Sequence, residues 1–224
     1  MASAEPNDLI DLLNQPSLTS VTSESLRALA LRGVLHRHRK NTVLIEEGDS
    51  GDTLYIILSG RLRAYSTGAN GREITYGVYG PGEYLGEMSL DGGPRSASVI
   101  TLETTACALV TRPTLQQYIA ERPEFAFELL AKVIRRARAA TLSTKKLALN
   151  DVYGRLKSLF DSLATPRPDG GRTIHERLTH QEIANRLGCS REMVSRLVKD
   201  LEVGGYVSAE RSQLKILRDL PARW

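Results

Sequence analysis

The sequence predicts an α+β fold in three parts, and three patterns point to it. Residues 1–122 contain short apolar strands separated by glycines, as in an antiparallel β-barrel or jelly roll. Residues 123–150 hold one long helical pattern. Residues 151–224 include two short helices and a hairpin, which is the arrangement of a winged helix-turn-helix. A chain of 224 residues is long enough for two such domains with cores of their own.

The strands of the first part are expected over residues 42–110. Within them, Asn70-Gly71 predicts a hairpin with a two-residue type I′ turn, because both central residues of that turn need positive φ. Before the strands, the segment "SESLRALALRG" predicts a helix with Ser23 as its N-cap and Gly33 at its end.

The central segment predicts a helix that nothing breaks before Gly154. Apolar and small residues recur along it with alternating spacings of three and four, as in a coiled-coil seam. We expect these residues to form a dimer interface: Phe127, Leu130, Ile134, Ala137, Thr141 and Thr144. The alternative is a helix that lies on its own β domain, and we expect one stripe to do so: Phe125, Leu129 and Val133. Residues 164–172, rich in proline and glycine, are expected to form a loop.

The segment 179–217 predicts helix, tight turn, helix and wing. Thr179 is expected to cap the first helix, Gly188 to end it and Ser190 to cap the second. The second helix has an apolar stripe, and its remaining side chains are expected to point outward: Arg191, Glu192, Ser195, Arg196 and Lys199. Arginine can donate two hydrogen bonds to guanine, and glutamate can accept one from cytosine. The alternative is a helical hairpin with a solvated charged face.

The distribution of charge and the few cysteines and histidines limit which classes of function are expected. Residues 151–224 hold 13 Lys/Arg against 10 Asp/Glu, whereas residues 1–122 hold 11 against 14, so a nucleic-acid partner is expected at the C-terminal part. The two cysteines, Cys107 and Cys189, are expected to be buried and to suit a reducing cytoplasm. No apolar run is long enough for a membrane span. The four histidines show no repeated metal-ligand spacing and no serine or cysteine has a nucleophile's setting, so neither a metal site nor an enzyme is expected.

These motifs together resemble the cyclic-AMP receptor protein/FNR family of bacterial transcription regulators. The resemblance covers nearly the whole chain and is strongest in "GCSREMVSRLVKDLE" and "LALNDVYGRL". It implies that Arg191, Glu192 and Arg196 read bases of TGTGA-like inverted repeats. It also implies that Thr179, Gln181 and Ser190 lie near phosphates; Lys199 is expected to touch phosphate as well.

The segment "GEYLGEMSLDGGPRSASV", residues 82–99, resembles the phosphate-binding cassette of that family. The resemblance implies a cyclic-nucleotide site formed by these residues: Gly86, Glu87, Met88, Ser89, Arg95, Ser96 and Ala97. The Arg95 guanidinium suits a phosphodiester, and the Glu87 carboxylate suits a ribose hydroxyl. The alternative is a hairpin loop with an internal Glu87–Arg95 ion pair.

The identity of the ligand stays open at this point. Cyclic AMP is expected, but Ala140-Thr141 stands where the family's cyclic-AMP branch has Thr-Ser, so that only Thr141 offers a hydroxyl. Cyclic di-GMP on the same scaffold is the first alternative, a haem bound through histidine is another, and a ligand-binding module without a DNA target is a different class. The expected partners are double-stranded DNA, a cyclic nucleotide that acts allosterically, a second copy of the chain and RNA polymerase.

Overall fold

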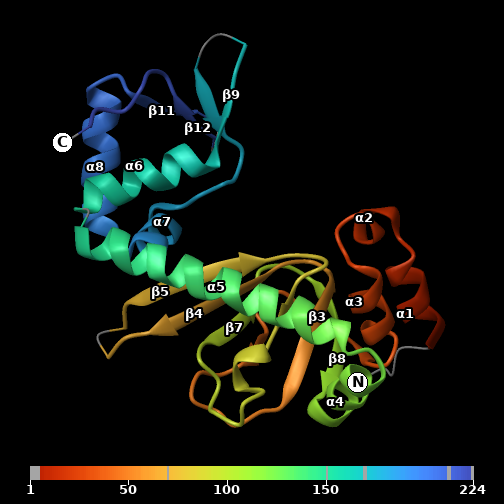
Figure 1. Ribbon diagram of the computed structural model, residues 1–224. Helices are drawn as coiled ribbons and strands as arrows, with labels where there is room; N and C mark the ends of the chain where they lie inside the picture. The colour runs from red at the N-terminus through yellow and green to blue at the C-terminus, as the bar shows by residue number, and fades with distance from the viewer. Residues whose placement is uncertain (1–5, 70, 150, 169–170, 211–212, 223–224) are drawn as a thin grey trace. The chain divides into compact units, whose positions relative to one another are not determined.

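The computed structural model describes residues 6–69, 71–149, 151–168, 171–210 and 213–222. The chain forms two compact units (Figure 1). Unit 1 consists of Met1–Ser66 with Thr75–Ile134, and unit 2 consists of Thr67–Ile74 with Arg135–Trp224. The domain boundaries expected after residues 122 and 150 stay predictions.

Unit 1 combines helices with two antiparallel sheets. Its helices are α1 (Pro6–Leu13), α2 (Pro16–Thr19), α3 (Glu24–Ala30), α4 (Arg112–Glu121) and the first part of α5 (Glu124–Leu149). In the described residues, one sheet has the order β1-β8-β3-β6 and the other the order β2-β7-β4-β5. The strands are β1 (Val34–His38), β2 (Val43–Ile45), β3 (Thr53–Ser59), β4 (Leu62–Thr67), β5 (Glu73–Tyr79), β6 (Tyr84–Leu85), β7 (Ser98–Thr101) and β8 (Thr105–Thr111). The expected α+β fold with an antiparallel β domain is confirmed, although the strands begin at Val34 rather than near residue 42.

The side chains of β3 point alternately to two sides and so contribute to two separate parts of the core of unit 1. Leu54, Ile56 and Leu58 belong to a buried cluster shared with the helices, whereas Ile57 belongs to a second cluster with strands of the other sheet. Successive strand residues point to opposite faces, so one strand serves both clusters. Cys107 is fully buried in the second cluster, as expected, and burial raises the pKa of its thiol to about 12. Cys189 is only half-buried, so its expected burial is wrong.

The hairpin between β4 and β5 forms as expected, but its turn differs. The amide of Gly71 donates to the carbonyl of Gly68 at 2.9 Å, so Gly71, with φ of +74°, closes the turn instead of standing at its centre. The amide of Gly68 donates to the carbonyl of Arg72 at 2.8 Å. Asn70, the other residue of the expected type I′ turn, lies outside the described residues.

The long helix ends earlier than expected. α5 ends at Leu149, and α6 (Val152–Leu163) begins anew with Asp151 as its N-cap. The Asp151 Oδ1 accepts the amide of Gly154 at 2.7 Å, and such a bond satisfies a donor that a new helix leaves without a partner. The expectation of an unbroken helix up to Gly154 is therefore wrong, and Gly154 lies in the first turn of α6.

Unit 2 contains the end of α5 and, in the described residues, packs three further helices with a small sheet. The helices are α6, α7 (His180–Leu187) and α8 (Arg191–Val203), and in the described residues the sheet has the order β11-β12-β10-β9. Its strands are β9 (Ala164–Pro166), β10 (Arg172–Ile174), β11 (Val207–Glu210) and β12 (Gln213–Ile216). The expected helix-turn-helix and wing are confirmed; residues 211–212 of the wing's turn are not described. The expectation of a plain loop over 164–172 is wrong at its flanks, because β9 pairs with β10 and β10 also pairs with β12.

Candidate ligand-binding and DNA-binding sites

A sharp turn follows β6 and opens the predicted ligand segment. Gly86 has φ of +95°, and the 3₁₀ turn Glu87–Ser89 comes directly after it. A Cβ atom at Gly86 would lie 2.4 Å from the carbonyl oxygen of Thr53 and 2.7 Å from Nη1 of Arg95. Only glycine fits here, since both the positive φ and the close approach exclude a side chain.

Arg95 is buried beneath this turn, with 7% of its surface exposed. Its Nη1 donates to the Gly86 carbonyl at 3.0 Å and to the Ser89 hydroxyl at 2.9 Å, and its Nη2 donates to the Thr53 carbonyl at 3.1 Å. Its main chain is held too, because its amide donates to the carbonyl of Asp49 at 2.8 Å. All three side-chain bonds go to neutral oxygens, so the ion pair with Glu87 that the alternative required is not among them.

The other predicted ligand residues differ in burial. Glu87 and Ser89 are buried, at 7% and 2% exposed, whereas Met88 is 53% exposed. Ser96 is exposed and Ala97 is half-buried. The segment thus places two polar residues and Arg95 inward.

Sequence reasoning missed the partners that hold the loop from the β2–β3 side. Gly51 lies against Arg95 so closely that a Cβ atom would be 2.6 Å from its Nε. The Ser98 hydroxyl accepts the amide of Glu47 at 3.0 Å and donates to Oε2 of Glu46 at 3.3 Å. No local pattern marks these residues, because they contact the loop only through the fold.

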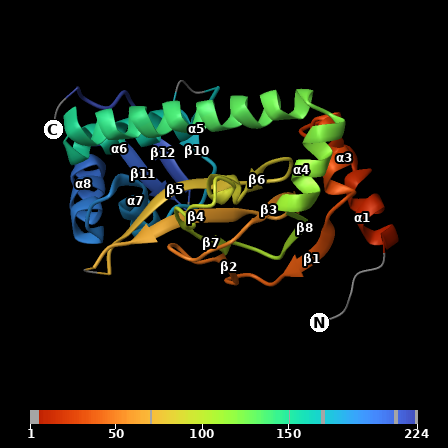
Figure 2. The same cartoon turned by 60° about the horizontal axis from the view of Figure 1, so that its bottom comes forward.

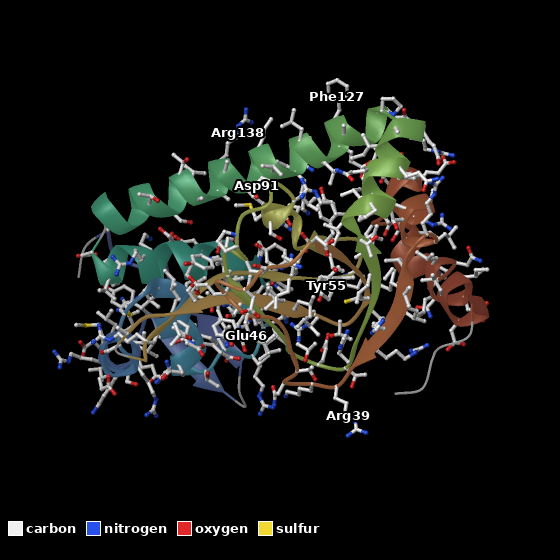
Figure 3. All side chains as sticks on the ribbon, turned by 90° about the horizontal axis from the view of Figure 1, so that it is seen from below. Arg39, Glu46, Tyr55, Asp91, Phe127 and Arg138 are labelled. Atoms are coloured by element: carbon white, nitrogen blue, oxygen red, sulfur yellow. The ribbon has the colours of Figure 1, made fainter. Side chains whose placement is uncertain are left out.

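A pocket of about 330 Å³ reaches Arg95 from strand β2 and the loop that precedes β3. Among its lining residues are Glu46, Asp49, Asp52 and Tyr55, but Arg95 is the one predicted ligand residue among them. Figure 3 labels Glu46 and Tyr55. Burial raises the pKa of Tyr55, and the Arg95 charge opposes this rise.

The predicted interface residues of α5 are exposed. Phe127, Leu130 and Ile134 are 75%, 53% and 41% exposed, and Ala137, Thr141 and Thr144 are exposed as well. Figure 3 shows Phe127 projecting from α5 away from the β strands. On the other stripe, Phe125 is fully buried and Leu129 packs on the core as expected, but Val133 is 37% exposed, so its expected burial is wrong.

Thr141 belongs to unit 2, so its place beside the ligand segment stays a prediction. Its hydroxyl donates to the carbonyl of Ala137 at 3.0 Å, one turn back along α5.

The helix-turn-helix has the expected caps. Thr179 caps α7 in a capping box with Glu182, whose amide donates to the Thr179 hydroxyl at 3.2 Å. Gly188 ends α7 in the left-handed conformation with φ of +64°, and the Ser190 hydroxyl accepts the amide of Met193 at 3.3 Å. α7 and α8 pack through buried apolar residues of both helices (Figure 2): Ile183, Ala184, Leu187, Val194, Leu197, Val198 and Leu201.

The exposed charged side chains of α8 include the four that were expected to point outward: Arg191, Glu192, Arg196 and Lys199. The pKa of Glu192 is lowered by a hydrogen bond from its own amide and a second one from the Ser190 hydroxyl. Glu192 therefore stays an ionised acceptor at neutral pH. Ser195 does not point outward as expected: it is half-buried, and its Oγ lies 2.8 Å from Nδ1 of His180.

The residues predicted near phosphates have partners within the protein. The Thr179 hydroxyl also donates to Oε2 of Glu182 at 2.8 Å, and Nε2 of the exposed Gln181 donates to Oδ1 of Asn185 at 2.7 Å. Sequence reasoning missed the ion pair between Arg186 and Glu176, which ties α7 to the segment before it.

The sequence matches two protein families and is similar to known regulators. Residues 35–122 match the family described as "Cyclic nucleotide-binding domain", and residues 177–205 match "Bacterial regulatory proteins, crp family". A "CRP-like cAMP-activated global transcriptional regulator" of Mycobacterium tuberculosis is 35% identical over 183 residues, which cover 80% of this chain and 81% of the relative. This chain belongs to the cyclic-AMP receptor protein/FNR family of bacterial transcription regulators.

Other family members are similar over comparable lengths. The "cAMP-activated global transcriptional regulator CRP" of Haemophilus influenzae is 33% identical over 182 residues, or 78% of this chain and 80% of the relative. The solved structure of the c-di-GMP responsive regulator CLP of Xanthomonas campestris has a TM-score of 0.77 at 25% identity, covering 86% of this chain and 97% of that one. A CooA variant from Carboxydothermus hydrogenoformans, at 20% identity and a TM-score of 0.74, shares the fold; the match covers 95% of this chain and 92% of that one.

Both functional halves of a family member are thus recognisable in this chain: a cyclic-nucleotide-binding domain and a DNA-binding helix-turn-helix. Neither match includes residues 123–176, so the interface expected on α5 rests on exposure and spacing alone. Among the described residues, no helix is long and apolar enough to cross a membrane.

Proposed function

We propose that this protein is a homodimeric regulator of transcription that binds cyclic AMP in unit 1 and operator DNA through α8. One observation carries the ligand half of the proposal. Arg95 is buried, and its hydrogen bonds go to neutral oxygens of Thr53, Gly86 and Ser89. A buried cation with neutral partners favours an anion beside it, and a guanidinium matches the oxygens of a phosphodiester.

The remaining ligand contacts come from the same segment. We place amides of the turn Glu87–Ser89 and of Ser96 and Ala97 around the other phosphate oxygens, with Gly86 allowing the approach. The Glu87 carboxylate would accept a ribose hydroxyl, and Met88 would lie at the rim. Thr141 would offer its hydroxyl to the base across the dimer.

Cyclic AMP is the preferred ligand, and cyclic di-GMP is the second candidate. Arg95 is the only arginine in residues 82–99, which suits a ligand with one phosphodiester better than a ligand with two. Relatives at 35% and 33% identity are named as cAMP-activated regulators. The similarity to a c-di-GMP responsive regulator keeps the second candidate open.

The DNA half rests on the exposed edge of α8. Arg191 and Arg196 would each donate two hydrogen bonds to a guanine, and Glu192 would accept one from a cytosine. A dimer that presents two such helices about 34 Å apart would select an inverted repeat of TGTGA-like half-sites. Phosphates would be contacted by four residues at the two helices: Thr179, Gln181, Ser190 and Lys199.

Several finer points belong to the same proposal. The second copy would pair through the exposed stripe of α5, RNA polymerase would be the partner at promoters, and the protein would act in the cytoplasm. We also propose that it catalyses no reaction and needs no metal or cofactor. Ligand binding would shift the population between two arrangements of the central helices.

Calorimetry with cyclic AMP, cyclic GMP and cyclic di-GMP tests the ligand, and selection from random DNA tests the operator. We expect cyclic AMP to bind most tightly and the liganded protein to enrich a TGTGA-like palindrome. Preferred binding of cyclic di-GMP would replace the ligand and keep the site. Binding of no cyclic nucleotide, or selection of no palindrome, would overturn the corresponding half of the proposal.

A further inference from the structure

Three segments that are far apart in the sequence meet at the turn that enters β6. Gly82, with φ of +81°, lies so close to the loop between α2 and α3 that a Cβ atom would be 2.8 Å from the carbonyl oxygen of Val21. In the same loop, the Ser23 hydroxyl donates to Oε1 of Glu128 on α5 at 2.6 Å. The turn, the loop and α5 thus form one junction within unit 1.

An ion pair joins the turn directly to α5. Nζ of Lys132 lies 2.9 Å from Oε1 of Glu83, and the two side chains are 21% and 35% exposed. The other oxygen of Glu83 accepts the amide of Gly80 at 3.0 Å, and the Lys132 Nζ lies 5.8 Å from the centre of the Tyr84 ring. One carboxylate therefore holds the turn with one oxygen and the helix with the other. Water and salt screen a partly buried pair less than an exposed one.

The turn leads straight into the candidate ligand segment. Glu83 is fixed to β3, because its carbonyl accepts the amide of Ile57 at 2.8 Å. Tyr84 and Leu85 are buried, and Gly86, whose carbonyl Arg95 holds, comes next. Only Tyr84 and Leu85 therefore stand between Glu83 of the ion pair and Gly86, whose carbonyl oxygen orients Arg95.

Along α5, Lys132 lies within the span of the exposed stripe but on the opposite face of the helix, because residues two apart do not share a helix face. Leu129 packs on the core of unit 1, whereas Leu130 and Ile134 are 53% and 41% exposed. Lys132 lies between them in sequence. A rotation or shift of α5 about this point would change how the stripe is presented.

We propose that the Glu83–Lys132 pair positions α5 relative to the ligand segment and so sets how strongly ligand binding changes DNA binding. The inference rests on the proposed function, since it concerns the response to the same ligand. Lys132 and Glu83 are positioning residues: they touch neither the proposed phosphate contacts nor the DNA-reading side chains. Gly82 brings the loop between α2 and α3 against the same turn, and Ser23 ties that loop to α5.

The test measures coupling in the full-length protein. The coupling factor is the ratio of operator dissociation constants without and with cyclic AMP, measured by fluorescence anisotropy. We expect Lys132→Gln and Glu83→Gln each to lower this factor by roughly fivefold or more, while the affinity for cyclic AMP alone, measured by calorimetry, changes less than about threefold. Because coupling is reciprocal, operator DNA must lose the same factor in its effect on cyclic-AMP affinity.

Three further variants separate coupling from folding. Lys132→Arg keeps the charge and should keep the coupling, and the double exchange Glu83→Lys with Lys132→Glu should recover most of it. Arg61→Gln is the matched control: it breaks an ion pair with Glu103 in the same unit at a more exposed position, with side chains 50% and 45% exposed, and should change nothing. Thermal melting of each variant checks that unit 1 is folded.

Three results would overturn the inference, and they can be distinguished. If the wild-type protein responds to cyclic AMP and both glutamine variants respond equally, the positioning role is wrong and the proposed function stands. If the wild-type protein shows no response to a cyclic nucleotide, the proposed function and this inference fail together. A loss of coupling that neither Lys132→Arg nor the double exchange recovers would also contradict the ion pair as its cause.

Discussion

We propose that Arg95 meets a phosphodiester and Arg191 a base, and the two arginines lie in opposite surroundings. Arg95 is 7% exposed, and three hydrogen bonds hold its guanidinium before any ligand arrives. Arg191 is exposed at the first position of α8. A small ligand offers few contacts, so the site must be rigid beforehand, whereas a long duplex offers many contacts and tolerates exposed side chains.

The two carboxylates beside these arginines differ in the same way. Glu87 is 7% exposed, whereas Glu192 is exposed and has its pKa lowered by its own amide and the Ser190 hydroxyl. The proposed ligand site is thus held by burial, whereas the proposed DNA-reading edge lies exposed at a helix N-terminus. Four changes should separate the two sites.

The largest effect is expected for Ile134→Glu. The variant should fold as a monomer, because Ile134 is already 41% exposed in a single chain, but a buried carboxylate would face its copy across the interface. Sedimentation should show monomers and operator binding should be lost, while ligand binding by unit 1 persists. Val34→Glu, at a residue 63% exposed on β1, is the control and should stay dimeric. A dimeric Ile134→Glu would move the interface elsewhere.

Arg95→Ala should weaken cyclic-AMP binding by an order of magnitude or more, since a guanidinium–phosphate contact contributes about 1.5–3 kcal/mol. Calorimetry measures the change. Arg95→Lys keeps the charge without the two-pronged geometry and should lie between Arg95→Ala and the wild type. Arg61→Ala, at an exposed arginine of the same unit, is the control. Equal affinities in all four proteins would remove the cassette as the ligand site.

Glu192→Ala should relax the preference at one base pair of each half-site by about 1–3 kcal/mol and leave non-specific affinity nearly unchanged. Competition between matched and mismatched operators measures this. Because the pKa of Glu192 is lowered, its carboxylate stays ionised at pH values at which an ordinary glutamate begins to take up a proton. The preference is lost only as the pH falls through the lowered pKa. The preference should therefore persist at pH 5. If it disappears there, the ionised acceptor is not its source.

The smallest effect is expected for Lys199→Ala. This variant should weaken binding to all DNA sequences alike and reduce the slope of log affinity against log salt by about 1, because a lysine at a phosphate releases one counterion. Titrations at several salt concentrations measure the slope. Lys40→Ala, at an exposed residue of unit 1, should leave it unchanged. A sequence-dependent loss would instead make Lys199 a base-reading residue.

The sequence by itself determined the features that depend on neighbours along the chain. Ser23, Thr179 and Ser190 cap their helices as expected, and Gly188 ends α7 in the left-handed conformation. Each of these depends on one side chain and the next three or four residues, which local rules describe well. The confirmed α+β fold with a helix-turn-helix follows from such signals and from apolar periodicity.

Only the tertiary structure decided which distant groups meet. The acceptors of Arg95, the contact of Ser195 with His180 and the pairing of β9 with β10 join residues that no local pattern connects. The Glu83–Lys132 pair spans 49 positions. The physical reason is that burial and long-range pairing depend on how whole strands and helices pack, so the same polar residue becomes exposed in one place and structural in another.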